Sequence, residues 1–318
     1  GEASSQHLVY RVEDSRQPFN QCGTVEFPAG GVAHAGEMGP ASVGHHHDEA
    51  THVAPVGASV GASGAGSTAT LSGSTLDQPA TSEGRGPTVK LCELGVDSDF
   101  EFYQANGSNS TNVVNDIENV VNSIEAVYEG ESVNTQFEVT TIIVRTVNAA
   151  PYNAIPSSGG AGSHSTLLNA FQNLWTTDPN FSASVIKRDV AHLFTGKNIA
   201  NNNGGIIGVA YLGVLCNSAS YFGLSQSRWS ANFNNRVSVT THEIGHNFGG
   251  THCNQAGEVC TGLPTCGVMC ASVGGCSGSI LVWGACTAGQ IASGRDSLGG
   301  CMSNLGSPLA APFTHAFD

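Results

Sequence analysis

Three histidines within eleven residues constrain this chain more than any other feature of its sequence. His242 and His246 are four residues apart, so on a helix their imidazoles stand on one face, one turn apart. Gly249 permits a positive φ, which lets the chain leave the helix and bring back His252. Three imidazole nitrogens around one point are the ligand set of a catalytic zinc ion, whose fourth position stays open. The spacing therefore predicts a zinc centre.

Glu243 follows the first of these histidines on the same helical turn. Its carboxylate can meet a metal-bound water without being a ligand, so we predict that Glu243 is the general base. The alternative is a buried amphipathic helix whose histidines are satisfied by core hydrogen bonds. Two other histidines, His164 and His192, match no ligand spacing, and we expect them to be structural.

Charged residues are scarce, at 11% of 318 residues, and the formal net charge is −14. Nucleic acid and anionic membranes require a basic patch, which eleven Lys and Arg can hardly supply, so we expect neither partner. No apolar run approaches the roughly 20 residues that span a bilayer. We therefore expect no membrane span.

The chain contains ten cysteines, eight of them between Cys216 and Cys301. So many cysteines do not suit a reducing cytosol unless they bind metal, and the candidate metal site here uses histidines. The cysteine content therefore predicts a secreted or otherwise extracytoplasmic protein.

Changes in composition divide the chain into four regions. Residues 7–12 and 23–27 are short strand-like runs, whereas the Gly, Ala and Ser that follow offer little to bury. The predicted regions are a pro-segment remnant over 1–29, a flexible linker over 30–87, the catalytic domain over 88–306 and a C-terminal tail over 307–318.

Within residues 88–306, strand and helix patterns alternate. The β-rich runs predict strands over 88–96, 137–147, 189–194 and 206–215. Apolar residues at helical spacing predict helices over 109–128 and 165–175. After His252 the sequence is rich in Gly, Ser and Cys, so we expect an irregular, disulfide-held segment with one short helix opening at 289–293. The expected fold is a mixed sheet with helices over it.

Taken together, residues 188–196, residues 208–213 with Cys216, and the zinc motif resemble the adamalysin (reprolysin) branch of the metzincin metalloproteases. The resemblance covers roughly residues 88–304. It implies an α/β metzincin catalytic domain with a twisted, mostly parallel five-stranded sheet, an active-site helix and a small irregular, disulfide-rich lower subdomain. It also implies endopeptidase activity on protein or peptide substrates that bind extended along an edge strand.

The same resemblance implies roles for single residues. Met269 matches the Met-turn, an apolar floor under the zinc ligands. Cys216 and Cys301 match a disulfide of the family. Where adamalysins usually have Asp after the third histidine, this chain has Cys253.

A calcium site is also implied, because many adamalysins hold calcium away from the cleft. The matching positions are Glu93, Asp189, the carbonyl of Cys301, and Asn304. Such oxygen ligands suit calcium. The alternative is a surface of unrelated polar residues.

Cys22-Gly23 resembles the Cys-Gly of the family's cysteine switch. A thiolate in the open zinc position would exclude the catalytic water, so the N-terminal pro-segment is predicted to be an intramolecular inhibitor. Arg85 is the only Lys or Arg between Arg16 and Lys90, and a trypsin-like cut after it would release the inhibitory piece. The alternative is an ordinary disulfide at Cys22.

These observations predict a secreted zinc endopeptidase in which zinc polarises the scissile carbonyl and Glu243 carries the proton. A rival prediction is a non-catalytic extracellular domain that keeps the zinc and uses the cleft for binding or adhesion. A catalytically dead relative would be expected to lose Glu243 first, so its presence favours the enzyme. A zinc amidase that acts on a non-peptide substrate is also compatible with the motif.

Overall fold

The computed structural model of the protein describes residues 7–10, 36–40, 88–130, 133–157, 163–199, 205–263 and 265–306. In chain order, the elements are β1 (His7–Tyr10), β2 (Gly36–Pro40), β3 (Val89–Ser98), α1 (Phe100–Ala105), α2 (Ser110–Glu129), β4 (Thr135–Arg145), α3 (Ser163–Thr177), η2 (Pro179–Phe181), β5 (Val190–Phe194), β6 (Gly208–Ala210), β7 (Phe222–Ser225), η3 (Ser227–Trp229), α4 (Phe233–Asn247), β8 (Ser272–Val273), α5 (Ala285–Leu298) and β9 (Ser303–Gly306).

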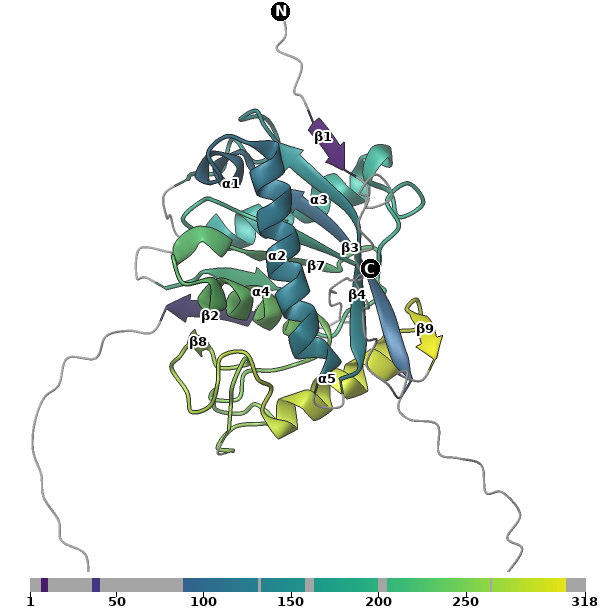
Figure 1. Cartoon of the computed structure of the whole chain (residues 1–318), viewed down its shortest axis with the longest axis vertical. Helices are drawn as coiled ribbons and strands as arrows, with labels where there is room; N and C mark the ends of the chain where they lie inside the picture. Colours follow the sequence, from purple (N-terminus) through teal and green to yellow (C-terminus); the bar gives the residue numbers. More distant parts are fainter. Residues whose placement is uncertain are drawn as a thin grey trace, which may run out of the picture. The chain divides into compact units, whose positions relative to one another are not determined.

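Five strands form the centre of the sheet, in the order β4-β3-β5-β7-β6, of which β3, β4 and β7 are labelled in Figure 1. The first four are parallel to one another, and β6 is antiparallel to β7. This confirms the predicted mostly parallel five-stranded sheet. Short strands extend it: β1 pairs with β4 at one edge, β2 pairs with β6 at the other, and β9 pairs with the start of β3.

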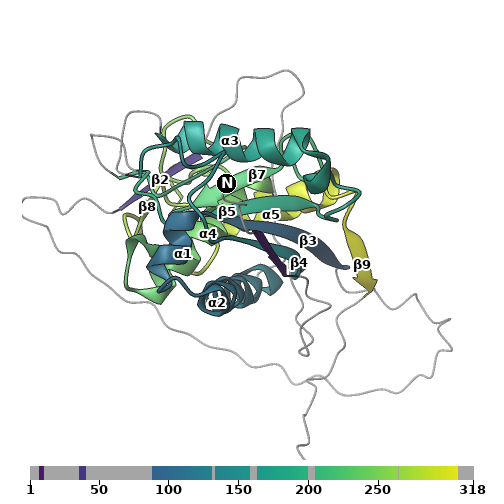
Figure 2. The same cartoon turned by 90° about the horizontal axis from the view of Figure 1, so that it is seen from above.

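Helices cover both faces of the sheet, α3 on one side and α2 with α4 on the other (Figure 2). The predicted apolar face of α2 is buried, and the helix starts at Asn109, whose side chain accepts hydrogen bonds from two first-turn backbone N–H groups. The buried positions of α2 that the periodicity predicted are Val113, Val114, Ile117, Val120, Val121, Ile124 and Val127.

A buried ion pair joins two strands of the sheet, and a hydrogen bond to the same carboxylate links it to α3. Asp97 of β3 accepts hydrogen bonds from Arg145 Nε at 2.8 Å and from Arg145 Nη2 at 2.6 Å. The Tyr152 hydroxyl and Trp175 Nε1 of α3 each donate to the same carboxylate at 2.9 Å. Because these donors satisfy the carboxylate, its charge can lie fully buried.

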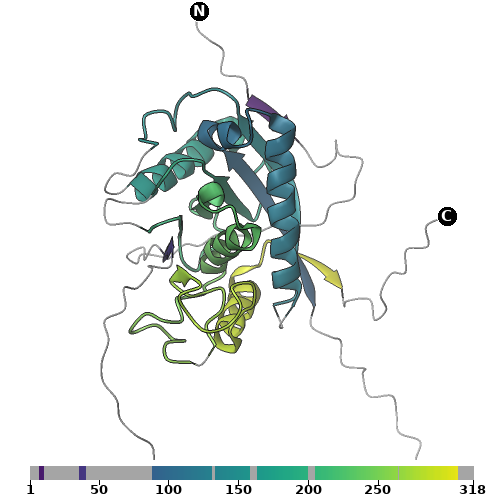
Figure 3. The same ribbon diagram turned by 60° about the vertical axis from the view of Figure 1, so that its left-hand side comes forward.

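The segment after α4 is irregular, as predicted, and lies with α5 below the active-site helix (Figure 3). Disulfides link Cys253 to Cys266, Cys260 to Cys286, and Cys270 to Cys276. The predicted Cys216–Cys301 disulfide is confirmed. Of the two cysteines outside these four bonds, Cys92 is buried in β3 and Cys22 lies outside the described residues.

Some element boundaries differ from the sequence predictions. The strand expected over 206–215 ends at Ala210, because the next residues turn away and Gly213 and Val214 donate backbone hydrogen bonds to the end of α4. Strand β7 was not predicted, since four residues that include a glycine give little pattern. Helix α5 is longer than expected, and its few apolar residues explain why the sequence shows only part of it.

The N-terminal region is described only at two strands. The strand predicted over residues 7–12 is present as β1. Strand β2 falls inside the range predicted as linker, so that prediction does not describe these five residues. Three predicted segments lie outside the described residues: the run at 23–27, the remainder of the linker up to residue 87, and the tail from residue 307. The four-region division therefore stays a prediction. Among the described helices, none has the length and apolarity needed to cross a membrane.

Candidate metal centre

Helix α4 fixes the first two histidines of the motif. The side chain of Asn232 caps its start by accepting from the N–H of Asn234 at 2.9 Å, and every residue from Arg236 to Asn247 is buried. The rings of His242 and His246 therefore lie on one face, with centroids 4.5 Å apart.

A tight turn then brings in the third histidine. Gly249 has a φ of +91°, as the sequence predicted, and the N–H of Gly250 donates to the carbonyl of Gly245 at 2.9 Å. This turn places the ring of His252 with its centroid 4.8 Å from that of His246.

The three rings point their Nε2 atoms at one another. His242 Nε2 lies 2.9 Å from His246 Nε2 and 3.1 Å from His252 Nε2. On the far side of the rings, Nδ1 of His242 meets the carbonyl of Val268 at 2.8 Å, and Nδ1 of His246 meets that of Gly250 at 2.7 Å. A carbonyl only accepts, so each Nδ1 carries the proton and leaves the Nε2 lone pair facing inward.

Burial keeps these imidazoles neutral. It lowers the pKa of His246 to about 3, with a smaller contribution from His252. The pKa of His242 is also far below its ordinary value, first because the ring is buried and second because His246 and His252 are close. Neutral imidazole is the form that binds metal.

The donor set fits zinc. Nitrogens at about 2.05 Å from a tetrahedral zinc lie about 3.3 Å apart, close to the separations found here. Inward lone pairs at this separation repel one another, and a cation between them removes the repulsion. The carbonyls that hold the Nδ1 atoms supply the outer hydrogen bonds that orient metal-binding imidazoles.

Glu243 is fully buried on α4, beside the first ligand. Its carboxylate packs against strand β6 at Gly208, where a Cβ atom would overlap Glu243 Oε1. The absence of a side chain at Gly208 is therefore what allows Glu243 to lie between the helix and the edge strand. The sequence analysis missed this role of Gly208, because nothing in the local sequence links it to Glu243.

Met269, the residue that the resemblance assigns to the Met-turn, packs against the motif helix at Gly245. It is fully buried, and a Cβ built on Gly245 would approach its sulfur to 2.8 Å. The close contact between α4 and Met269 therefore depends on the absence of a side chain at Gly245. Met269 directly follows Val268, whose carbonyl holds His242, so the same turn packs against α4 and anchors the first histidine.

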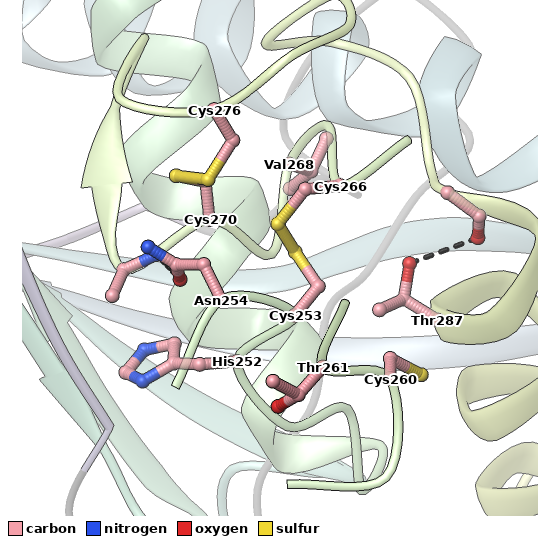
Figure 4. The surroundings of a disulfide bond; sticks show 12 residues. His252, Cys253, Asn254, Cys260, Thr261, Cys266, Val268, Cys270, Cys276 and Thr287 are labelled. Atoms are coloured by element: carbon pink, nitrogen blue, oxygen red, sulfur yellow. Dashed lines mark hydrogen bonds between the residues drawn. A yellow bond between two sulfur atoms is a disulfide. The ribbon is translucent and has the colours of Figure 1, made fainter. Parts of the chain in front are cut away.

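Cys253 takes a structural role that the sequence did not predict. Its disulfide to Cys266 ties the residue after His252 to the segment that leads into Val268 (Figure 4). The N–H of Cys253 also donates to the carbonyl of Met269 at 3.1 Å. These two links hold the third ligand against the turn that anchors the first.

The residues of the predicted calcium site are only partly gathered. The N–H of Glu93 donates to Asp189 Oδ2 at 2.9 Å, and the N–H of Cys216 donates to the carbonyl of Asp189 at 3.4 Å, next to the Cys216–Cys301 disulfide. However, the carboxylate of Glu93 forms an ion pair with Lys187. Asn304 pairs in register with Lys90, three positions before Glu93 on β3.

The two other histidines singled out from the sequence, His164 and His192, lie outside this centre. His192 is fully buried in β5, its Nε2 lies 3.0 Å from the Ser225 hydroxyl, and burial lowers its pKa to about 3, which makes it a neutral core residue. His164 lies in α3, on the opposite face of the sheet from α4. Cys22 and Arg85 lie outside the described residues.

Comparison with known families gives one decisive match. Residues 88–290 match the Reprolysin_5 model, described as Metallo-peptidase family M12. The chain belongs to this family. The family is one of metallopeptidases, and the histidine triad is the candidate metal site of this chain.

Other comparisons add little to the M12 assignment. No curated protein matches the chain. Among solved structures, metalloproteinase-II from Bacteroides fragilis is 14% identical with a TM-score of 0.39, over 66% of this chain and 55% of that one. A chaperone–substrate complex is 15% identical with a TM-score of 0.37, over 52% of this chain and 24% of the other. This chain thus spans a quarter to about half of their lengths, and likenesses this low say nothing about its activity.

The contact between β6 and Glu243 generates a prediction. The substitution Gly208→Ala should force the Glu243 carboxylate away from its position, and a displacement of about 1 Å can cost roughly 100-fold in rate. We expect kcat/KM on a peptide substrate to fall by about that factor while zinc content stays at one ion per chain. Gly289→Ala in α5 is the control, because a Cβ there meets nothing within 4 Å. Parental activity in Gly208→Ala would contradict the proposed contact.

Proposed function

We propose that this M12 metallopeptidase is a secreted, adamalysin-like endopeptidase whose zinc is held by His242, His246 and His252 and whose general base is Glu243. The observation that carries the proposal is the buried triad, in which three Nε2 atoms converge. Glu243, also buried, lies on α4 together with the first two histidines. A zinc ion held there would polarise the scissile carbonyl and increase the acidity of water.

Glu243 moves the proton in this proposal. A carboxylate oxygen of Glu243 takes a proton from the attacking water and delivers it to the leaving nitrogen of the peptide. Burial suits this task, because a carboxylate shielded from solvent holds the proton close to the reacting atoms. The packing of its side chain against Gly208 fixes the carboxylate at the inner side of β6.

Strand β6 supplies the surface along which a peptide substrate would bind. It is the last strand of the five-stranded centre, and its outer edge, which β2 occupies in this structure, is the edge with which an extended peptide substrate would pair. Its residues, Gly208, Val209 and Ala210, are small or medium in size, which lets a substrate backbone come close to Glu243.

Glu243→Ala tests the assigned mechanism. The variant loses the proton carrier and no metal ligand, so hydrolysis of casein should fall by about 10²–10⁴-fold while bound zinc is retained. His246→Ala should lose both activity and zinc. Glu258→Ala, in the irregular segment after His252, is the matched control and should keep both. If Glu243→Ala cleaved casein at the parental rate, Glu243 would not be the base. If neither it nor the parent cleaved any peptide once Cys22→Ser is introduced into both, the zinc-binding domain would be non-catalytic.

We also propose that Cys22 keeps the protease latent by binding the zinc until the chain is cut after Arg85. A thiolate tethered in the same chain acts at an effective concentration in the mM range, so Cys22→Ser should raise the hydrolysis rate of the full-length protein about tenfold or more. Cleavage of the parent after Arg85 should give a similar rise. Equal rates for parent, variant and cleaved protein would exclude the switch.

Secretion is the cellular setting that we propose. Four disulfides in the described residues support it, because such bonds persist in oxidising compartments and are rare in the cytosol.

Calcium is proposed at Glu93, Asp189, the Cys301 carbonyl and Asn304. Binding there would tie β3 to the C-terminal strand β9, and saturation at about 100 times Kd should stabilise the fold by about 2.7 kcal/mol. That gain corresponds to a rise in Tm of roughly 5–10 °C for a domain of this size. Asn304→Ala should abolish the rise, whereas Asn153→Ala, an exposed residue elsewhere, should not. An unchanged Tm between excess calcium and a calcium chelator, with zinc kept saturated, would disprove the site.

A further inference from the structure

Strand β2, from the N-terminal part of the chain, bridges two strands beside the metal centre. Gly36, Glu37 and Met38 pair antiparallel with Ala210, Val209 and Gly208 of β6. Gly39 and Pro40 pair parallel with Ser272 and Val273 of β8. Among the described strands, only β2 pairs with the outer edge of β6 and with β8 (Figure 1). The five residues therefore occupy the edge at which we propose that substrates bind.

The register places one peptide bond next to the proposed chemistry. Met38 pairs with Gly208, the residue against which the Glu243 carboxylate packs. Paired residues of antiparallel strands have Cα atoms about 4.5–5.5 Å apart. The bond between Met38 and Gly39 is the point at which β2 passes from β6 to β8. Helix α4, which carries Glu243, also lies against β2.

The sequence of β2 suits close approach of its backbone. Gly36 and Gly39 carry no side chain, so the main chain on either side of Met38 can come near neighbouring atoms. Pro40 has no N–H and so ends the ladder just beyond the candidate bond. Main-chain pairing of this kind is how an extended peptide adds to the edge of a sheet.

We propose that residues 36–40 are an intramolecular substrate, and that the enzyme hydrolyses its own Met38–Gly39 bond. Until it does so, the segment excludes other peptides from the edge of β6. This inference rests on the proposed function, because it uses the same peptidase centre. One water is consumed: the C–N bond breaks, the hydroxyl goes to the Met38 carbonyl carbon, and the remaining proton goes to the Gly39 nitrogen.

The cut would separate the proposed inhibitory residue from the proposed catalytic residues. Cys22 lies on the N-terminal side of the Met38–Gly39 bond, and all three histidines and Glu243 lie on the C-terminal side. Hydrolysis would therefore end the tether that holds β2 at the edge and, with it, the tether of Cys22. It would leave a new N-terminus at Gly39, upstream of Arg85.

The test measures by mass spectrometry whether the full-length chain is cut after zinc is added. It uses the parent and Cys22→Ser, so that inhibition by the Cys22 thiol cannot hide the cleavage. We expect two products, residues 1–38 and 39–318, formed with a first-order rate that stays constant over a hundredfold dilution. A rate proportional to protein concentration would mean cleavage between molecules and would overturn the proposal. So would cuts at other bonds only.

A proline variant tests the pairing itself. The double substitution Gly36→Pro/Glu37→Pro removes two successive backbone N–H groups. Because alternate N–H groups of a strand face the same neighbouring strand, one of these two belongs to the pairing with β6 and is lost. We expect slower self-cleavage and a faster initial rate on a quenched fluorescent peptide. With a segment at mM effective concentration and an affinity of about 0.1 mM, the rise is about tenfold. Ala58→Pro/Ser59→Pro, outside β2, is the matched control and should behave as the parent.

The fluorescent peptide also separates the two proposals. If the parent cleaves that peptide but never its own Met38–Gly39 bond, self-cleavage is wrong and the proposed function stands. If neither the parent nor the proline variant, each also carrying Cys22→Ser, cleaves the peptide or itself, the proposed function fails and self-cleavage fails with it.

Discussion

Three imidazoles whose Nε2 atoms converge in the interior of the protein are the constraint on which the rest of this structure depends. Without a cation such a cluster is repulsive, so its geometry must be imposed by the surrounding chain. Two ligands are imposed by the regular rise of α4, which is buried over twelve successive residues. The third requires a reversal of the chain within five residues, and Gly249 supplies it with its positive φ.

The two halves of the domain hold this cluster in different ways. Above it, the sheet and its helices form a conventional apolar core, stabilised at its centre by the satisfied carboxylate of Asp97. Below it, the chain has little regular structure and is held by three short-range disulfides. The carbonyl of Val268 comes from the lower half and orients His242 of the upper half, so the metal centre lies where the two kinds of structure meet.

The sequence predicted best where local pattern and chemistry coincide. The spacing of the histidines and the glycine between them defined the turn, and the apolar period of α2 defined which face is buried. It failed where an interaction joins residues far apart. The role of Gly208 follows from its contact with Glu243. The role of Cys253 follows from its disulfide to Cys266 and its hydrogen bond to Met269. Strand β2 is five residues of weak strand propensity, paired because an edge was open to it.

The disulfide between Cys253 and Cys266 has a consequence for how the metal centre matures. His242 and His246 are brought together by the formation of one helix, but His252 is followed directly by a covalent link that exists only after oxidation. Two electrons must therefore leave the chain before the third ligand is fixed in place. The position of the third histidine is therefore coupled to the oxidation state of two thiols, although neither sulfur belongs to the triad itself.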